Sequence, residues 1–372
     1  MVAVHVRGSE SGALRAAVAL VRGLEPVMDV HLTIALSNDP LVITVGSGAS
    51  AVTCANVNEL AKLLRRHIHW LPPPSSEPLR LFVAGDKSQV GKSTTCMALL
   101  GAFLKLGYRA DELAYIKPTT QCEAPQMIST FCTHHGIAAV PIGPVVFFSG
   151  FTRSFLDQPD QQAASSVLLD SIRDAVRGLS RGKRIVVVDG VGYPSVGSIC
   201  GVSNADVASA LRPISVLLVG KPGVGDAVDS FNLNASYFEA AGLRVLGAVF
   251  NRLPAEGYYC LANCERSVRQ YFAHHAYRDQ KAYGFVPEFS PTITDDTSAT
   301  YEQIVSNFTA SVDVVGLLRD ARNVINATPK RRLEPLALPE SPPLKKARPL
   351  TIAFQDRSTV QTQAAASGAA SS

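Results

Sequence analysis

The stretch "GDKSQVGKST", residues 85–94, has the residue types of a phosphate-binding loop. Glycines let the backbone turn so that successive N–H groups point at phosphate oxygens. The N-terminus of a following helix adds partial positive charge. In such a loop Lys92 bridges the β- and γ-phosphates of a nucleotide, and Ser93 binds Mg²⁺ through its hydroxyl. We therefore expect ATP contacts from eight residues: Gly85, Lys87, Ser88, Val90, Gly91, Lys92, Ser93 and Thr94.

The spacing within this loop is unusual. Five residues separate Gly85 from Gly91, where the common pattern has four. A second lysine, Lys87, stands five positions before Lys92. Its side chain either contacts phosphate or is a solvated lysine at the tip of the loop.

Three other polar side chains follow apolar runs that read as buried strands. Asp189 ends "RIVVVD" and is placed to hold Mg²⁺ directly or through water, although an acidic residue at a strand end can also cap a helix. Lys117 ends "AYIK"; it either stabilises charge that develops during phosphoryl transfer or extends to solvent from the sheet rim. Asn251 ends "AVFN", and its amide can both donate to and accept from an adenine edge.

The elements that must position these residues alternate along the chain. Strands rich in Val, Ile and Leu that alternate with helices predict an α/β fold, with a mostly parallel sheet and helices on both faces. Ligands bind such sheets at the carboxyl ends of the strands, where the loops above fall. Strands are predicted at 79–85, 112–118, 184–190, 214–220 and 244–251, and helices at 92–107, 166–180, 202–212 and 230–243.

The rest of the chain divides into three parts. Residues 1–70 predict a small α/β unit, with strands at 2–6, 30–36 and 41–45 and helices at 11–24 and 56–68; it lacks a catalytic motif, so we expect a packing or partner-binding role. Residues 71–78 form a proline-rich linker to the domain at 79–327. Residues 328–372 have the composition of a disordered tail. Its two basic clusters, within residues 330–348, have the spacing of a two-part nuclear import signal.

Composition limits the classes of function. The 372 residues are 47% apolar, which suffices for a normal core, and a net charge of +4 gives no broad electrostatic case for nucleic acid. Seven scattered cysteines suit a reducing compartment, and "C-LAN-C" at 260–264 with two later histidines matches no familiar zinc spacing. No secretory signal or membrane-spanning apolar run is apparent. We expect a cytoplasmic protein, with nuclear entry through 330–348 as an option.

Taken in order, the motifs of residues 80–290 resemble those of dethiobiotin synthetases. That family has a loop G-T-D-T-x-V-G-K-T, here G-D-K-S-Q-V-G-K-S, followed by a strand ending in K-P, here Lys117–Pro118. Its E-G-A-G-G segment stands here as D-G-V-G-Y from Asp189, and its V-G loop as residues 218–225. Its G-V-V-x-N-R and L-G-x-x-P segments stand as "GAVFNRL" and "YGFVPE".

The resemblance implies a P-loop NTPase fold, ATP and Mg²⁺ as cofactors, and an ATP-dependent ligase. In that reaction a diamine takes up CO₂ as a carbamate, ATP phosphorylates the carbamate, and the second amine displaces phosphate to close a cyclic urea. Lys92 and Lys117 would be the catalytic residues: Lys92 binds the phosphates, and Lys117 stabilises the carbamate and the transferred phosphoryl group. Asp189 takes the place of the family's glutamate, and Asn251 that of its base-reading asparagine.

The sequence departs from the family's pattern near the acceptor. The family's small residues after K-P are replaced by "TTQC" at 119–122, and the only candidate for its further acidic Mg²⁺ ligand is Glu123. The diamine-like acceptor is therefore expected to differ. Segments 123–165 and 255–300 match no motif, and we expect them to build the acceptor site and a lid on the adenine side.

Two other functions compete with the ligase. Related phosphate-loop ATPases of partitioning and metal-ion export carry a lysine at the position of Lys87, which reaches across a homodimer to the partner's nucleotide. Lys87, the unit at 1–70 and the basic tail therefore favour a nucleotide-dependent regulatory switch that binds a protein partner. A polynucleotide kinase is a more distant alternative, because such enzymes need an acidic pair where this chain has "IKPTTQCE".

Overall fold

The computed structural model describes residues 78–121, 126–275, 279–290 and 297–327, together with four strands between residues 2 and 54. These strands form one sheet in the order β1-β2-β3-β4: β1 (Val2–Arg7) runs parallel to β2 (Leu32–Asn38), and β3 (Leu41–Val45) and β4 (Val52–Cys54) follow antiparallel. The sequence predicted the first three strands. The predicted helices at 11–24 and 56–68, Glu123 and the tail at 328–372 lie outside the described residues.

A seven-stranded sheet forms the centre of the domain predicted at 79–327, in the order β13-β12-β11-β5-β10-β6-β8. Every pairing in it is parallel, which confirms the predicted sheet. The two edge strands β8 and β13 were not predicted as strands. A separate short sheet pairs β7 (Thr119–Thr120) with β9 (Val145–Val146). The strands of the large sheet are β5 (Leu79–Gly85), β6 (Leu113–Ile116), β8 (Ala138–Val140), β10 (Ile185–Asp189), β11 (Ser215–Gly220), β12 (Arg244–Leu253) and β13 (Lys281–Pro287).

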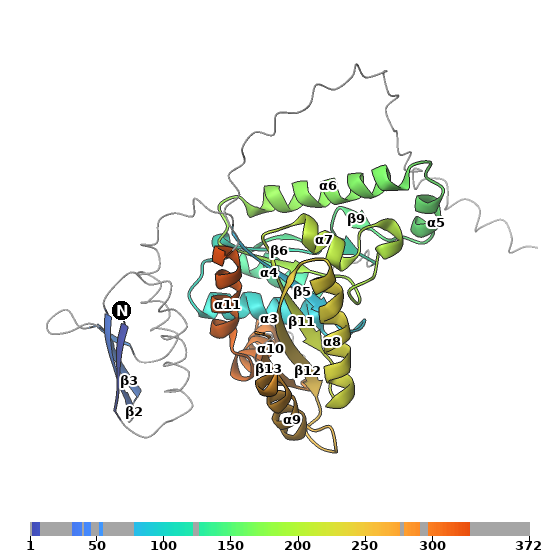
Figure 1. The fold of residues 1–372 in the computed structure, drawn as a ribbon. Coiled ribbons are helices and arrows are strands. Elements are labelled where there is room, and N and C mark those ends of the chain that lie inside the picture. The colour runs from blue at the N-terminus through green and yellow to red at the C-terminus, as the bar shows by residue number, and fades with distance from the viewer. Residues whose placement is uncertain are drawn as a thin grey trace, which may run out of the picture. The chain divides into compact units, whose positions relative to one another are not determined.

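Helices cover both faces of this sheet, as predicted (Figure 1). Alternate side chains of a strand point to opposite faces, so Leu81 and Val83 enter one core while Phe82 and Ala84 enter the other. The first core is closed by α3 (Lys92–Lys105), α4 (Met127–His135), α10 (Thr297–Ser311) and α11 (Val314–Ala327). The second is closed by α5 (Phe151–Leu156), α6 (Gln161–Ser180), α7 (Asn204–Ala210), α8 (Gly225–Ala240) and α9 (Leu261–His274).

Helix α3 connects the phosphate-binding loop to the first core. Its apolar side chains recur at helical spacing, and Cys96, Leu99, Leu100 and Phe103 are fully buried. The helix ends where Gly107 adopts a left-handed conformation (φ 91°), which is the common way to terminate a helix. In the part of the chain that is described, no helix is long and apolar enough to cross a bilayer.

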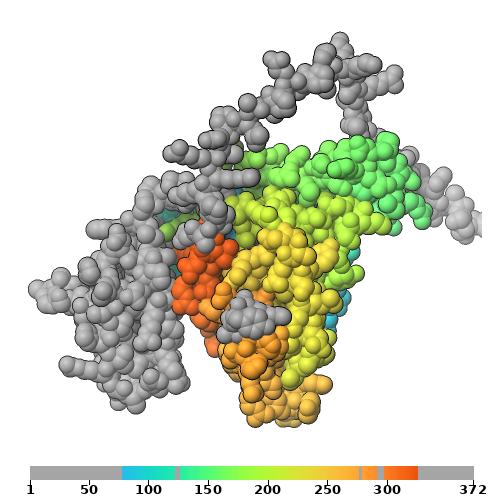
Figure 2. Space-filling view, viewed as in Figure 1, coloured from blue at the N-terminus to red at the C-terminus, as the bar shows by residue number. Residues whose placement is uncertain are grey.

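Helices α8 and α9 lie side by side on the surface of the second face (Figure 2). The rings of Phe231 and Phe272 meet with centroids 5.0 Å apart. Asn232 donates to the Tyr271 hydroxyl (2.8 Å) and accepts from it (3.0 Å). These contacts fix α9, and with it the loop that enters α9 from β12.

Gly247 allows β12 and β13 to approach, and its replacement is expected to destabilise the sheet. Its φ of 143° is unfavourable for other residues, and a Cβ there would overlap the Lys281 backbone. We expect Gly247→Ala to lower the free energy of unfolding by about 3 kcal/mol, measured by urea denaturation. Gly178→Ala is the matched control: it lies in α6 with nothing within 4 Å of its Cβ position, and it should stabilise by about 0.5–1 kcal/mol. Equal stability of the two variants would contradict this account.

Candidate functional site

The phosphate-binding loop leaves β5 at Gly85 and returns into α3 at Lys92. A Cβ at Gly85 would stand 2.7 Å from Val90 and 2.9 Å from the Lys87 carbonyl oxygen, so only glycine fits this turn. Gly91 has φ 96° and caps α3, and the first turn of the helix contains no acidic side chain. The loop therefore has a backbone suited to presenting N–H groups and a helix N-terminus to an anion.

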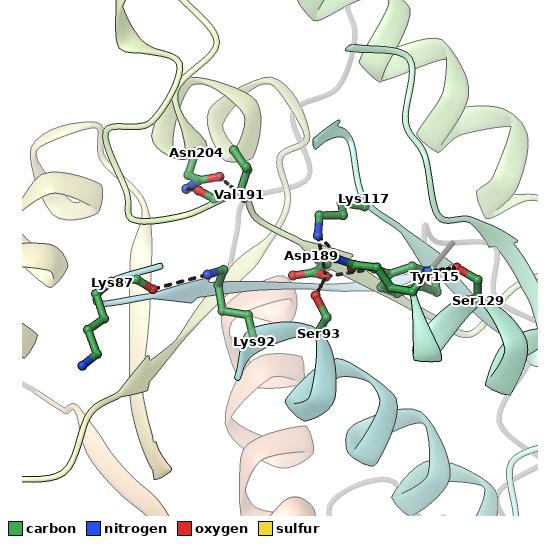
Figure 3. A network of polar contacts seen from close by, with 10 residues as sticks. Lys87, Lys92, Ser93, Tyr115, Lys117, Ser129, Asp189, Val191 and Asn204 are labelled. Carbon is green, nitrogen blue, oxygen red and sulfur yellow. Dashed lines mark hydrogen bonds and ion pairs between the residues drawn. The ribbon is translucent and has the colours of Figure 1, made fainter. Parts of the chain in front are cut away.

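Asp189 is the centre of the polar network at this edge of the sheet (Figure 3). Its side chain is fully buried at the end of β10. Its Oδ2 accepts hydrogen bonds from the Ser93 hydroxyl (2.7 Å) and the Tyr115 hydroxyl (2.8 Å), and the Lys117 amine lies 3.9 Å away. The structure thus brings together three residues that the sequence assigned separately, namely Ser93, Lys117 and Asp189.

Lys92 and Lys117 are two buried lysines whose charges act on the site around the Asp189 carboxylate. Lys92 is 8% exposed, and its amine donates to the Lys87 carbonyl oxygen (3.4 Å). Burial lowers the pKa of Lys92, whereas the negative charge of Asp189 acts to raise it. Lys117 is 7% exposed. Two buried amines beside the N-terminus of α3 favour an anionic ligand such as a polyphosphate.

Mg²⁺ fits the residues at Asp189. The Oδ1 atom of Asp189 is buried and has no hydrogen-bond partner within the described residues. Such an unpaired oxygen is costly unless a cation or water meets it. The Ser93 hydroxyl next to it is a second oxygen of the type that Mg²⁺ prefers. The described part of the chain has no group of three or more His, Cys, Asp or Glu side chains that suits a metal, so nucleotide and water would supply the other ligands.

Lys117 is held by the segments on both sides of it. Its amine donates to Gln126 Oε1 (3.0 Å), and its backbone N–H donates to the Val140 carbonyl oxygen (3.0 Å). Thr119 and Thr120, which replace small residues of the dethiobiotin synthetase pattern, are buried in β7. They therefore lie in a small sheet and do not open onto solvent. Because these two side chains are packed away, other segments would have to line an acceptor pocket beside Lys117.

Asn251 holds the phosphate-binding loop from the side of β12. Its amide nitrogen donates one of its two N–H groups to the Val90 carbonyl oxygen (2.9 Å). The second N–H and the side-chain oxygen keep the capacity to make the predicted adenine contact. The next residue, Arg252, donates to the Gln89 carbonyl oxygen (3.2 Å). Both Arg252 (φ 60°) and Gln89 (φ 61°) have left-handed backbones. Strained residues of this kind cluster at ligand sites, where the surroundings must hold them in place.

Sequence reasoning missed residues that shape the site without carrying charge. Tyr115 donates to Asp189, and its only sequence signal is a hydroxyl within an otherwise apolar strand. Buried Asn204 binds the loop after Asp189: its oxygen accepts from Val191 N–H (3.0 Å), and its nitrogen donates to the Val191 and Tyr193 carbonyl oxygens (both 2.8 Å). A Cβ at Gly190 would stand 2.9 Å from the Asn204 oxygen, which explains the glycine after Asp189.

Asp86 and Lys87, which are adjacent in the loop, differ in environment. Asp86 Oδ2 accepts from Lys221 N–H (3.0 Å) and from the Ser230 hydroxyl (3.4 Å), so it ties the phosphate-binding loop to the loop after β11 and to α8. Burial raises the pKa of Asp86. The Lys87 side chain is exposed, and its amine points away from Lys92 (Figure 3).

The parallel sheet, the glycine loop and the Lys92–Ser93–Asp189 constellation define a P-loop NTPase. A family model described as "AAA domain" matches residues 79–292, which is more than half of the chain. The chain therefore belongs to this family, AAA_26.

Three of the solved structures that match this chain are as follows. The cell division protein FtsY of Thermotoga maritima is 14% identical, with a TM-score of 0.36 over 67% of this chain and 76% of that chain. The 54 kDa signal recognition particle protein of Aeropyrum pernix K1, solved with GDP, is 15% identical, with a TM-score of 0.36 over 73% and 54% of the two chains. A plasmid partition protein of Borrelia burgdorferi is 14% identical, with a TM-score of 0.38 over 62% and 97%.

Proposed function

We propose that residues 79–327 bind ATP with Mg²⁺ and transfer the γ-phosphoryl group to an acceptor held at Lys117. The observation that carries this proposal is the pair of buried amines, Lys92 and Lys117, beside Asp189 and Ser93. Lys92 stands at the N-terminus of the phosphate-binding helix, whereas Lys117 comes from a neighbouring strand end. Such an arrangement neutralises charge on both sides of a phosphoryl transfer.

The proposed reaction is of the dethiobiotin synthetase type. An amine of the acceptor adds to CO₂ and loses a proton, which gives a carbamate. A carbamate oxygen attacks the γ-phosphorus, ADP leaves, and a mixed anhydride forms. A second amine attacks the carbonyl carbon, phosphate leaves, and the C–N bond closes a cyclic urea.

Each residue of the network has a role in this scheme. Lys92 binds phosphate oxygens, and Lys117 stabilises the carbamate and the phosphoryl oxygens. Ser93 and Asp189 would hold Mg²⁺, which supplies charge neutralisation to the phosphates. Tyr115 orients Asp189 by donating to its Oδ2. The replaced residues after Pro118 and after Asp189 support an acceptor other than that of the known synthetases, although its two amines and the ring closure stay the same.

The experiment that tests the proposal is phosphate release from ATP and Mg²⁺ by the full chain. It is measured with diaminopelargonate and bicarbonate together, with each alone, and with other vicinal diamines. We expect release to rise only when a diamine and bicarbonate are both present, with stoichiometric incorporation of labelled bicarbonate. Release that no diamine stimulates would overturn the ligase.

Lys87 favours a second candidate, a nucleotide-dependent switch that acts as a homodimer. Its exposed amine points away from the phosphate site of its own chain, so it is free to meet a nucleotide on a second copy (Figure 3). The same full-length protein can be used to discriminate the ligase from the switch. ATP binding without diamine stimulation, together with dimers that sediment only when a non-hydrolysable ATP analogue is present, would support the switch.

A further inference from the structure

The location of the charged residues fixes the direction in which a nucleotide must lie, given the proposed ATP binding. Asp189 ends β10, and Lys117 follows β6; both strands lie on the same side of β5. The γ-phosphate end of the nucleotide therefore points toward β10 and β6. The nucleoside must extend to the opposite side, over the carboxyl ends of β11, β12 and β13.

An exposed pair of aromatic rings lies on that side. The loop after β12 carries Tyr258 and Tyr259, which are 80% and 49% exposed. Their ring centroids are 5.0 Å apart, with the ring planes at 85°. The strand that leads into this loop contacts the phosphate-binding loop through Asn251 and Arg252. The tyrosines thus belong to the segment that continues from the rim of the phosphate site.

The backbone that carries the two rings is fixed. Leu261 N–H donates to the Pro254 carbonyl oxygen (2.9 Å), and Cys260 N–H donates to that of Gly257 (3.1 Å). The Tyr258 and Tyr259 carbonyl oxygens accept from Asn263 (3.2 Å) and from the Cys264 thiol (3.2 Å). The loop is thereby closed onto the start of α9, while the rings face solvent. Their exposure leaves them little part in packing the core.

We propose that Tyr258 stacks on the purine base of the bound nucleotide and that Tyr259 supports the Tyr258 ring edge-on. An exposed aromatic face on a fixed backbone binds a planar base with little loss of conformational entropy. Stacking involves the whole π-face, so it favours the larger purines over pyrimidines without distinguishing adenine from guanine. The Asn251 amide, which uses one N–H on the Val90 carbonyl oxygen, then adds a contact to the base edge through its oxygen or its second N–H.

The test compares two probes that share the phosphates and differ in the base. Mg²⁺·ATP and Mg²⁺·tripolyphosphate are titrated by calorimetry into the full-length wild-type chain, Tyr258→Ala and Tyr258→Phe. We expect Tyr258→Ala to weaken ATP binding about tenfold or more and to leave tripolyphosphate binding unchanged. Tyr258→Phe should retain ATP binding, because the ring is preserved. The matched control, Tyr237→Ala, removes a 38% exposed tyrosine near the far end of α8 and should change neither affinity.

The base selectivity of the wild-type chain is a readout that does not depend on the folding of any variant. The wild-type chain should bind ATP and GTP several-fold more tightly than CTP and UTP, and Tyr258→Ala should lose this preference. Two results would overturn stacking: ATP affinity of Tyr258→Ala within twofold of wild type, or no purine preference in the wild type. Failure of the wild type to bind either ATP or tripolyphosphate would instead overturn the proposed nucleotide site, and stacking with it.

Discussion

Replacing Lys92 with alanine is expected to weaken ATP binding by roughly 2–4 kcal/mol, which is about 30- to 1000-fold. The physical reason is that Lys92 supplies a buried ammonium group at the start of α3, where the phosphates meet the helix N-terminus. A charge-assisted contact made away from water is worth more than an exposed ion pair. The affinity is measured by calorimetry with ATP and Mg²⁺.

The control for Lys92→Ala is Lys105→Ala, at the other end of the same helix. Lys105 pairs with Glu302 (2.6 Å) on α10 and lies far along α3 from the phosphate-binding loop, so its loss should leave ATP affinity unchanged. Circular dichroism and thermal unfolding of both variants would separate a binding defect from a folding defect. A folded Lys92→Ala variant that binds ATP like the wild type would refute the phosphate-binding role of this loop.

Replacing Lys117 with alanine is expected to remove turnover while ATP affinity stays near that of the wild type. Lys117 lies beside Asp189 on the acceptor side of the network, so its charge matters most when negative charge develops on the transferred group. A residue of this kind lowers kcat and kcat/KM together. Turnover is measured as phosphate release in the presence of the acceptor that stimulates it most, and ATP affinity is measured by calorimetry.

Lys117→Met separates charge from packing. The methionine side chain keeps much of the buried volume, whereas alanine leaves a cavity beside Gln126 and Asp189. If the ammonium group is responsible, the two variants lose turnover equally. Turnover in Lys117→Met close to that of the wild type would show that the side chain only fills space.

The phosphate-binding loop and the strands that flank it were predictable because their signals are local. The glycines at 85 and 91 are needed within the loop itself, where no other residue fits the turn or the left-handed backbone. The strand at 79–85 was predicted with the bounds of β5, since a run that is apolar except for Arg80 is typical of a strand buried on both faces. Parallel strands place their carboxyl ends at one edge, so Asp189 and Lys117 were expected there.

Short elements and edge strands were not predictable in the same way. The helix α5 and the strand β8 span only Phe151–Leu156 and Ala138–Val140, and segments of this length have weak local preferences. Packing against neighbouring elements decides their conformation. This explains why residues 123–165 gave no motif, although they include α4 with the Lys117 partner Gln126 at its start.

The amino-acid sequence alone determined the class of fold, the phosphate-binding loop and the strand ends that carry charge, because each depends on residues adjacent in the chain. Only the tertiary structure decided the partners of those residues. Ser93 and Tyr115 reach Asp189 across 96 and 74 residues of chain, and Asn251 turns its amide nitrogen to Val90 across 161. Such contacts depend on which strands become neighbours and how closely the backbones pack, and local patterns of residue type carry no record of either.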